Sequence, residues 1–201
     1  MGYMLIAMGA VVLLYILYSL LVTGLSMRQA QAGLRAAWEP RAAEASGPVL
    51  PGEALAVLRF ARPGTARRPV QDGSLYVVEG VGVEDLKKGP GHYTGTALPG
   101  QPGNFAVAGH RTTYGNPFFD LDELQPSDQV WVTDRQGTQW VYSVVRQEVV
   151  SPDAKRVLNP DPLSTGRPTL TLTSCHPRFS NAQRLVIFAQ LTTAPEGGEQ
   201  T

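Results

Sequence analysis

Three side chains of this sequence could together carry out nucleophilic catalysis, namely Cys175, His110 and Arg184. A thiolate is a strong nucleophile, an imidazole exchanges a proton near neutral pH, and a guanidinium offers several donors to a developing oxyanion. Cys175 is the one cysteine of the chain, so neither an intramolecular disulfide nor a cysteine-based zinc site can form. The competing interpretation of a single cysteine is a small, buried and unreactive side chain.

The residues before Cys175 predict the strand that would hold it. Hydroxyl-bearing residues and leucines alternate over 169–174, which places the leucines on one face and the hydroxyl groups on the other. Cys175 then lies where the strand gives way to a loop, so its backbone is held while its thiol stays accessible. Because neighbouring side chains on an extended chain point to opposite faces, the adjoining His176 is a poor partner, and the fold must supply His110.

His110 and Arg184 have comparable settings. His110 follows the apolar run 104–109, whose small residues leave open space beside the imidazole. Arg184 begins another apolar run nine residues after Cys175. If the strands of Cys175 and Arg184 are neighbours, their facing ends lie close together. The alternatives are an imidazole without a catalytic task, as we expect for His92, and an arginine on a solvated edge.

The elements expected around these residues are short strands. Runs rich in β-branched and aromatic residues are separated by Gly, Pro, Asn and Asp, a pattern typical of an all-β sandwich or barrel. The runs are 54–61, 75–80, 105–109, 129–134, 139–145, 169–174 and 184–191. A hairpin turn is expected at 134–137, and short helical turns near 83–88 and 117–124. The polar tail 194–201 is expected to be disordered.

The charges divide the chain of 201 residues into two unlike parts. Lys+Arg and Asp+Glu number 17 each, and this neutral balance argues against a nucleic-acid binder. None of these charges falls in 1–27, whose apolar run is long enough for a transmembrane anchor; a cleaved signal peptide is the alternative. Residues 28–52 are expected to be a juxtamembrane linker that is helical at most as far as Pro40, and 53–193 a single domain of common size.

Three segments of the chain resemble the sortase family. They read GPGHYTGTALPGQPGNFAVAGH, HRTTYG and TLTSCHPRFSNAQRLV, and the Cys-His-Pro and Thr-Thr-Tyr-Gly forms are most similar to class E. The resemblance covers about 53–193 and implies a closed β-barrel of about eight strands with short helices, preceded by one transmembrane helix. It also implies that Cys175 is the nucleophile, His110 the acid and base, and Arg184 the stabiliser of the oxyanion.

The same resemblance implies residues that bind the substrate. Tyr114 stands at the family position associated with accepting a sorting signal that contains alanine, and Ser174 and Ala108 are expected to bind substrate as well. Ser174 replaces a threonine that commonly precedes the cysteine, and the hydroxyl is kept. No cofactor and no metal are expected. Some sortases use calcium, but we expect the acidic stretch 120–128 to be solvated loop charge.

A sortase is expected to cleave a C-terminal LAxTG or LPxTG signal between Thr and Gly. The acyl group would pass through a thioester on Cys175 to an amine of a cell-wall precursor, so the expected partners are surface proteins that bear the signal. A pilin-polymerising sortase, which would use a pilin lysine as the amine, is an alternative. An alternative of another class is a membrane-tethered β-barrel that binds peptides without catalysis.

This function would place the chain in the cell membrane as a single-pass protein with its catalytic domain on the wall side. Arg28, Arg35 and Arg41 follow the apolar run, however, and no basic residue precedes it. By the positive-inside rule that pattern would put the domain in the cytoplasm. We therefore expect a basic stretch upstream of Met1.

Overall fold

The structure is a computed structural model that describes residues 2–38, 49–66, 68–70 and 73–193. The tail at 194–201 that was expected to be disordered lies outside these residues, as does the linker part at 39–48. The strands are β1 (Ala54–Ala61), β2 (Leu75–Glu79), β3 (Gly91–His92), β4 (Asn104–Ala108), β5 (Gln129–Asp134), β6 (Gln139–Val150), β7 (Thr169–His176) and β8 (Gln183–Thr193). The helices are α1 (Gly2–Trp38) and α2 (Val83–Leu86), with 3-10 turns η1 (Leu121–Glu123) and η2 (Lys155–Leu158).

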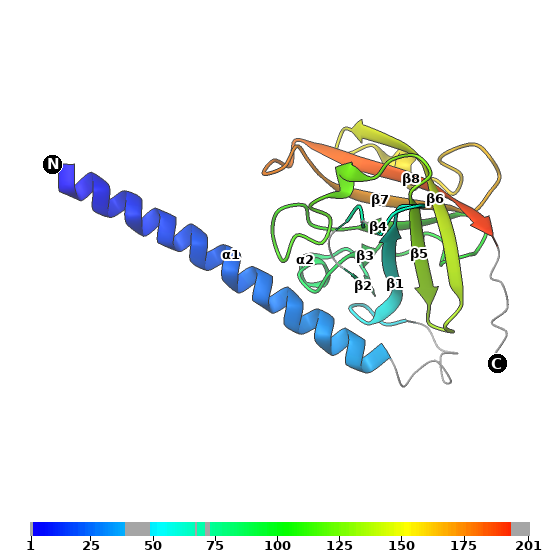
Figure 1. Cartoon of the computed structure of the whole chain (residues 1–201), viewed down its shortest axis with the longest axis horizontal. Coiled ribbons are helices and arrows are strands. Elements are labelled where there is room, and N and C mark those ends of the chain that lie inside the picture. The colour runs from blue at the N-terminus through cyan, green and yellow to red at the C-terminus, as the bar shows by residue number, and fades with distance from the viewer. Residues whose placement is uncertain (1, 39–48, 67, 71–72, 194–201) are drawn as a thin grey trace.

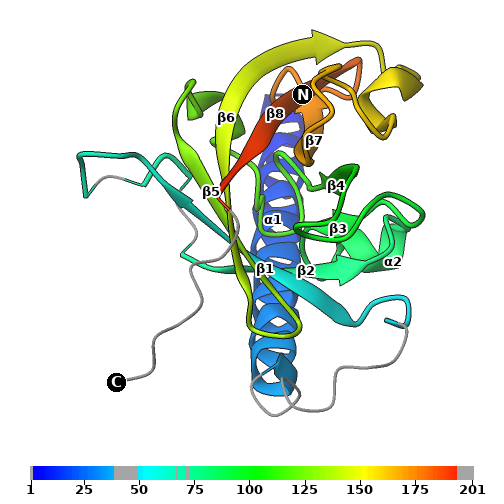
Figure 2. The ribbon, with the colours of Figure 1, turned by 90° about the vertical axis from the view of Figure 1, so that its right-hand side faces the viewer.

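The strands close into a barrel in the order β1-β2-β3-β4-β7-β8-β6-β5 (Figures 1 and 2). Two of its pairings are parallel, β2 with β3 and β4 with β7, and the others are antiparallel. Parallel neighbours need long crossover connections, so β4 and β7 are far apart in the chain although they lie side by side. The expected all-β closed barrel of about eight strands with short helices is confirmed.

The barrel interior holds the main core, and alternation along the strands decides which side chains enter it. Leu170 and Leu172 of β7 are fully buried there together with Phe105 and Val107 of β4. The intervening residues of each strand must then face outward. A second, smaller apolar cluster covers the outside of β8, where the connection 151–168 between β6 and β7 packs on Val186 and Phe188.

Most of the local expectations from the sequence are met. The hairpin turn forms after Asp134, whose carbonyl accepts the Gly137 N–H at 3.0 Å, and Gly137 has φ +81°. The helical turn expected at 83–88 is α2, and the one at 117–124 shortens to η1. Strand β3 was not expected, because two residues are too few to show a pattern.

Helix α1 runs without a break through the boundary that was expected at 27/28. Its N-terminal end lies away from the barrel, and its C-terminal half approaches β1 and β2 (Figure 1). Within the described ranges, no helix combines the length and the apolar character that crossing a membrane requires.

Candidate active site

Cys175 and Arg184 face each other across neighbouring strands. They are register partners in the antiparallel pair β7–β8, and directly opposed side chains of such a pair stand on the same face, about 5 Å apart at Cβ. Leu170 and Leu172 point into the barrel, so alternation puts Cys175 on the outer face. Its side chain is half-buried and carries no disulfide. The thiol is therefore held by the sheet and still accessible to a substrate.

The parallel pair β4–β7 brings His110 to the same end of the sheet. Ala108 is the register partner of Thr173, and the Gly109 N–H donates to the Thr173 carbonyl at 3.0 Å. The backbone continues for two residues past each of these register partners, from Ala108 to His110 and from Thr173 to Cys175. The fold thus supplies the histidine that the sequence could only place near the end of a strand.

The His110 imidazole is held by the loop that follows it. The Thr113 hydroxyl lies 3.2 Å from Nδ1, and the ring of Tyr114 lies 4.9 Å from the imidazole, centroid to centroid, at an interplanar angle of 39°. With Nδ1 engaged, Nε2 is left for proton exchange. Burial lowers the pKa of His110 below its ordinary value of 6.5, because desolvation disfavours the charged imidazolium.

The Arg184 side chain is held by the turn that precedes β8 and lies at the edge of a groove. Its Nη1 donates to the carbonyls of Asn181 at 3.0 Å and Gln183 at 2.9 Å. The groove has a volume of about 230 Å³ and lies outside the barrel, where Arg184 and Thr173 meet Tyr93 and residues 150–158. A guanidinium directly opposite a thiol, at the edge of a groove, can stabilise the oxyanion formed when that thiol attacks a carbonyl.

The expected substrate-binding residues occupy three different positions. Tyr114 stacks on His110 with φ +47°. Ser174 is buried, and its hydroxyl donates to the Gly109 carbonyl at 2.7 Å. Ala108 is buried at the end of β4. Ser174 therefore ties the Cys175 strand to the His110 strand, and its contact with substrate stays a prediction, as do those of Ala108 and Tyr114.

The other two histidines do not join this group. His92 is buried and pairs with Glu79, Nδ1 to Oε2 at 2.7 Å, while its Nε2 lies 2.9 Å from the Thr96 hydroxyl. His176 follows Cys175 on β7, so its side chain points to the opposite face. Its Nδ1 is buried and has no hydrogen-bond partner among the described residues.

Arg111 is a part of the site that sequence reasoning missed. Its side chain is 1% exposed, and its Nη2 pairs with Asp122 Oδ1 at 2.8 Å. Its Nε donates to the Phe119 carbonyl at 2.6 Å, and Nη1 approaches the Cys175 carbonyl at 3.5 Å. Burial lowers the pKa of Arg111 and Asp122 opposes this shift. The one sequence signal was its place directly after His110.

The acidic stretch 120–128 is solvated loop charge only in part. Asp122 and Glu123 are exposed, as expected, although Asp122 also pairs with Arg111 and with Arg178, the latter at 2.9 Å. Asp128 differs from the expectation: it is buried and pairs with Arg62 at 2.8 Å, as a desolvated carboxylate requires. Within the described residues, no group of three His, Cys, Asp or Glu side chains could hold a metal ion.

Comparisons with known proteins agree with this architecture. The sortase domain model matches residues 69–192. Sortase SrtE1 of Streptomyces coelicolor is 30% identical over 206 residues, which cover 94% of this chain and 56% of that protein. Sortase D of Bacillus subtilis is 31% identical over 134 residues, which cover 65% of this chain and 64% of that protein. The chain therefore spans a little over half the length of the first of these relatives.

Solved structures give the same result. Sortase E from Streptomyces avermitilis is 38% identical with a TM-score of 0.61, over 75% of this chain and 97% of that one. Sortase E1 from Streptomyces coelicolor, solved with a tripeptide in its active site, is 29% identical with a TM-score of 0.63, over 77% and 98% of the two chains. Because the family model covers more than half of its residues, the chain belongs to the sortase family of cysteine transpeptidases and is most like the class E members.

Proposed function

We propose that the chain is a class E sortase that cleaves a C-terminal LAxTG or LPxTG sorting signal between Thr and Gly. The observation that carries this proposal is the cross-strand pairing of Cys175 with Arg184 beside the strand end that bears His110. The groove at Arg184 supports a peptide substrate, as does the tripeptide bound in the active site of the similar sortase E1.

In the first half of the reaction the Cys175 thiolate attacks the Thr carbonyl carbon, and a C–S bond forms. The negative charge moves to the carbonyl oxygen, which faces Arg184. The Thr–Gly C–N bond then breaks, and His110 gives its proton to the leaving Gly amine, leaving a thioester on Cys175. A positioned acid of this kind contributes roughly 100- to 10,000-fold to the rate.

In the second half an amine of a cell-wall precursor attacks the thioester. His110 takes a proton from that amine, the new amide bond forms, and Cys175 leaves as the thiolate. The proton balance closes, because His110 loses one proton in the first half and regains one in the second. The accepting amine and the surface proteins that carry the signal are the partners of this proposal.

We further propose that the signal with Ala at its second position is preferred. Tyr114 supports this preference, because it stacks on His110 and so lies next to the reacting groups. The test compares cleavage of LAxTG and LPxTG peptides by the full chain. Equal or better turnover of the Pro peptide would refute the preference without affecting the catalytic assignment.

The catalytic assignment is tested by mass spectrometry of the acyl-enzyme. Wild-type chain incubated with a sorting peptide should gain the mass of the acyl fragment, and Cys175→Ala should not. His110→Ala should abolish turnover, while the matched variant His176→Ala should retain it. Loss of activity in His176→Ala together with retention in His110→Ala would overturn the assignment.

The location on the wall side of the cell membrane belongs to this proposal as well. The uncharged residues 1–27 support an anchor, and the chemistry requires access to surface proteins. Protease added to intact cells should digest the barrel if it lies outside the membrane. Protection of the barrel until the cells are lysed would contradict this location.

The pilin-polymerising alternative and the non-catalytic alternative are separated by two measurements. Supplying a pilin peptide with a Lys side chain or a cell-wall precursor amine identifies the preferred acceptor. A thiol probe that labels Cys175 fast, and is blocked by the sorting peptide, would exclude the inert peptide-binding barrel.

A further inference from the structure

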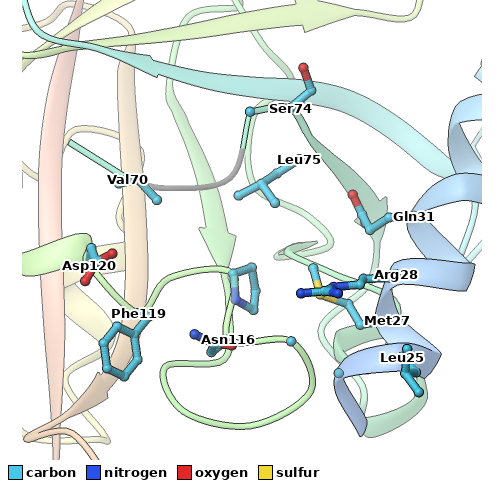
Figure 3. Close-up of a pocket in the computed structure, with 14 residues that line it drawn as sticks. Leu25, Met27, Arg28, Gln31, Val70, Ser74, Leu75, Asn116, Phe119 and Asp120 are labelled. Carbon is cyan, nitrogen blue, oxygen red and sulfur yellow. The ribbon is translucent and has the colours of Figure 1, made fainter. Parts of the chain in front are cut away.

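Helix α1 and the barrel enclose a cavity beside the loop that carries His110. The cavity has a volume of about 510 Å³. Its lining comes from α1 and from two parts of the barrel domain, and consists of Gly24, Leu25, Met27, Arg28, Gln31, Val70, Gly73, Ser74, Leu75, Gly115, Asn116, Pro117, Phe119 and Asp120. Figure 3 shows Met27, Arg28 and Gln31 of α1 on one side of it and Asn116 and Phe119 on the other. The C-terminal half of α1 therefore lies against part of the catalytic domain.

Gln31 docks α1 onto the edge of β2. Strand β3 is so short that it pairs only with Val78 and Glu79, which leaves the backbone at Tyr76 without a strand on that side. Gln31 takes the place of the missing strand: its Oε1 accepts the Tyr76 N–H at 2.8 Å, and its Nε2 donates to the Tyr76 carbonyl at 3.0 Å. A further bond runs from Nε2 to the Lys88 carbonyl at 2.8 Å.

Met27 lies one helical turn before Gln31 and is the only buried side chain among those that the structure describes on α1. It packs on Gly115, where φ is +69° and an added Cβ would collide with the Met27 sulfur. A residue four positions from Gln31 lies on the same face of the helix, so both side chains reach the barrel together. The conformation at Gly115 and the close approach of Met27 both require glycine there.

The loop that Met27 contacts also packs on the His110 imidazole. Gly115 is preceded by Tyr114, whose ring stacks on His110 at 4.9 Å. A second route from α1 runs through Lys88, which bonds to Gln31, to its neighbour Lys87, whose Nζ lies 5.8 Å from the centre of the Tyr114 ring. Helix α1 thus contacts Gly115, which adjoins Tyr114, and Lys88, which adjoins the lysine over the Tyr114 ring.

We propose that Met27 is a positioning residue for His110, and that Gln31 secures it by docking α1 on β2. Met27 holds Gly115, Gly115 holds Tyr114, and Tyr114 keeps the imidazole desolvated and aligned. The inference rests on the proposed function for its catalytic consequence. Its structural content, the coupling of α1 to the imidazole, can be measured without turnover.

The test uses the full chain and the variants Met27→Ala and Met27→Leu. Met27→Ala removes the contact with Gly115. Met27→Leu nearly conserves the side-chain volume and should therefore keep that contact. Leu25→Ala is the matched control, because Leu25 lines the same cavity on α1 but is 56% exposed. Gln31→Ala undocks the helix without touching the loop. Charged and titratable groups on the loop and on the elements packed around it are left unchanged by every variant; they are Arg28, Lys87, Arg111, Tyr114, Asp120, Asp122, Cys175, Arg178 and Arg184.

The first readout is the pKa of the His110 imidazole, measured by NMR titration. The variant His110→Gln identifies the resonances of this imidazole. We expect Met27→Ala and Gln31→Ala to raise this pKa towards its ordinary value, because the imidazole gains water, and Met27→Leu and Leu25→Ala to leave it unchanged. The second readout is steady-state cleavage of the sorting peptide. For Met27→Ala we expect kcat to fall about tenfold, inside the up to ~100-fold loss known for small misplacements, with KM within about twofold.

The outcomes separate the two proposals. An unchanged His110 pKa in Met27→Ala, in a chain that melts like wild type, would overturn the positioning role. A loss of kcat in Met27→Leu as large as that in Met27→Ala would also contradict the positioning role. Failure of the wild-type chain to form a thioester would instead overturn the proposed function, and the titration would still decide whether α1 acts on His110.

Discussion

Replacing Arg111 with Met should destabilise the barrel by about 2–3 kcal/mol. Arg111 is the largest fully buried side chain of the described residues, and Met keeps its length while removing the charge. Removing one partner of a fully buried ion pair usually costs about 3–5 kcal/mol, because the other charge is left unpaired, but the Asp122 carboxylate is 35% exposed and keeps part of its hydration. Here Arg178 still contacts Asp122 at 2.9 Å and still donates to the Phe119 carbonyl at 3.3 Å. These remaining contacts reduce the expected loss.

The matched control is Arg178→Met. Arg178 shares the Asp122 and Phe119 contacts of Arg111 and also lies 3.5 Å from Asp120 and over the Phe119 ring, but its side chain is 35% exposed, against 1% for Arg111. Solvent-exposed pairs contribute about 0–1 kcal/mol, so this variant should be nearly neutral. The double variant leaves both Asp122 and the Phe119 carbonyl without either arginine, and its loss should exceed the sum of the single losses, as expected for groups that share partners.

Urea unfolding of the four proteins at neutral pH measures these differences directly. A loss of 2–3 kcal/mol should also lower Tm by roughly 5–10 °C for a domain of this size. The reasoning is refuted if Arg178→Met costs as much as Arg111→Met, or if the two losses simply add. Either result would mean that burial of Arg111 does not decide the strength of the network.

Three further predictions concern pH and the strand that carries the nucleophile. The pKa of His110 is lowered by burial, so the unfolded chain binds more protons and stability should fall as pH drops below about 6.5; His110→Gln should flatten this part of the stability curve measured by urea unfolding. Burial alone would raise the pKa of Asp128, but bonds from Arg62 and from the Gln125 N–H lower it. Its contribution should therefore be present above about pH 4 and lost in more acidic solution, and Asp128→Asn should remove that acid dependence. Ser174→Ala should cost about 1 kcal/mol in thermal unfolding through loss of its bond to Gly109, and Ser174→Thr should retain that bond.

Most of the strands could be predicted from the sequence because they depend on local pattern. Alternation at 169–174 predicted which face of β7 enters the core, and Leu170 and Leu172 do so. Strand β6, however, continues to Val150, beyond the end expected at 145. The polar residues 146–148 interrupted the apolar signal before Val149 and Val150, but all of these residues pair with β8, as far as Val150 opposite Arg184. Tertiary pairing extended the strand where local pattern could not.

The contacts that support the site could not be predicted, because they depend on the paths of loops. The burial of Arg111 follows from the return of the 118–122 segment to the barrel, which puts Asp122 within 2.8 Å. The docking of Gln31 follows from the shortness of β3, which leaves the Tyr76 backbone open. Residue type did not indicate these contacts, since arginine and glutamine side chains are usually exposed.

The topology of the barrel also explains why His110, Cys175 and Arg184, which come from three separate strand ends, meet at one place. Parallel strands end at the same edge of a sheet, so residues that follow β4 and close β7 must meet there. An antiparallel neighbour begins at the edge where its partner ends, so the first residues of β8 arrive at the same place. Because a shift of one residue in register moves every side chain to the opposite face, the pairing of Cys175 with Arg184 depends on the whole β7–β8 ladder. The buried leucines of β7 therefore fix the position of Cys175, although none of them lines the groove at Arg184.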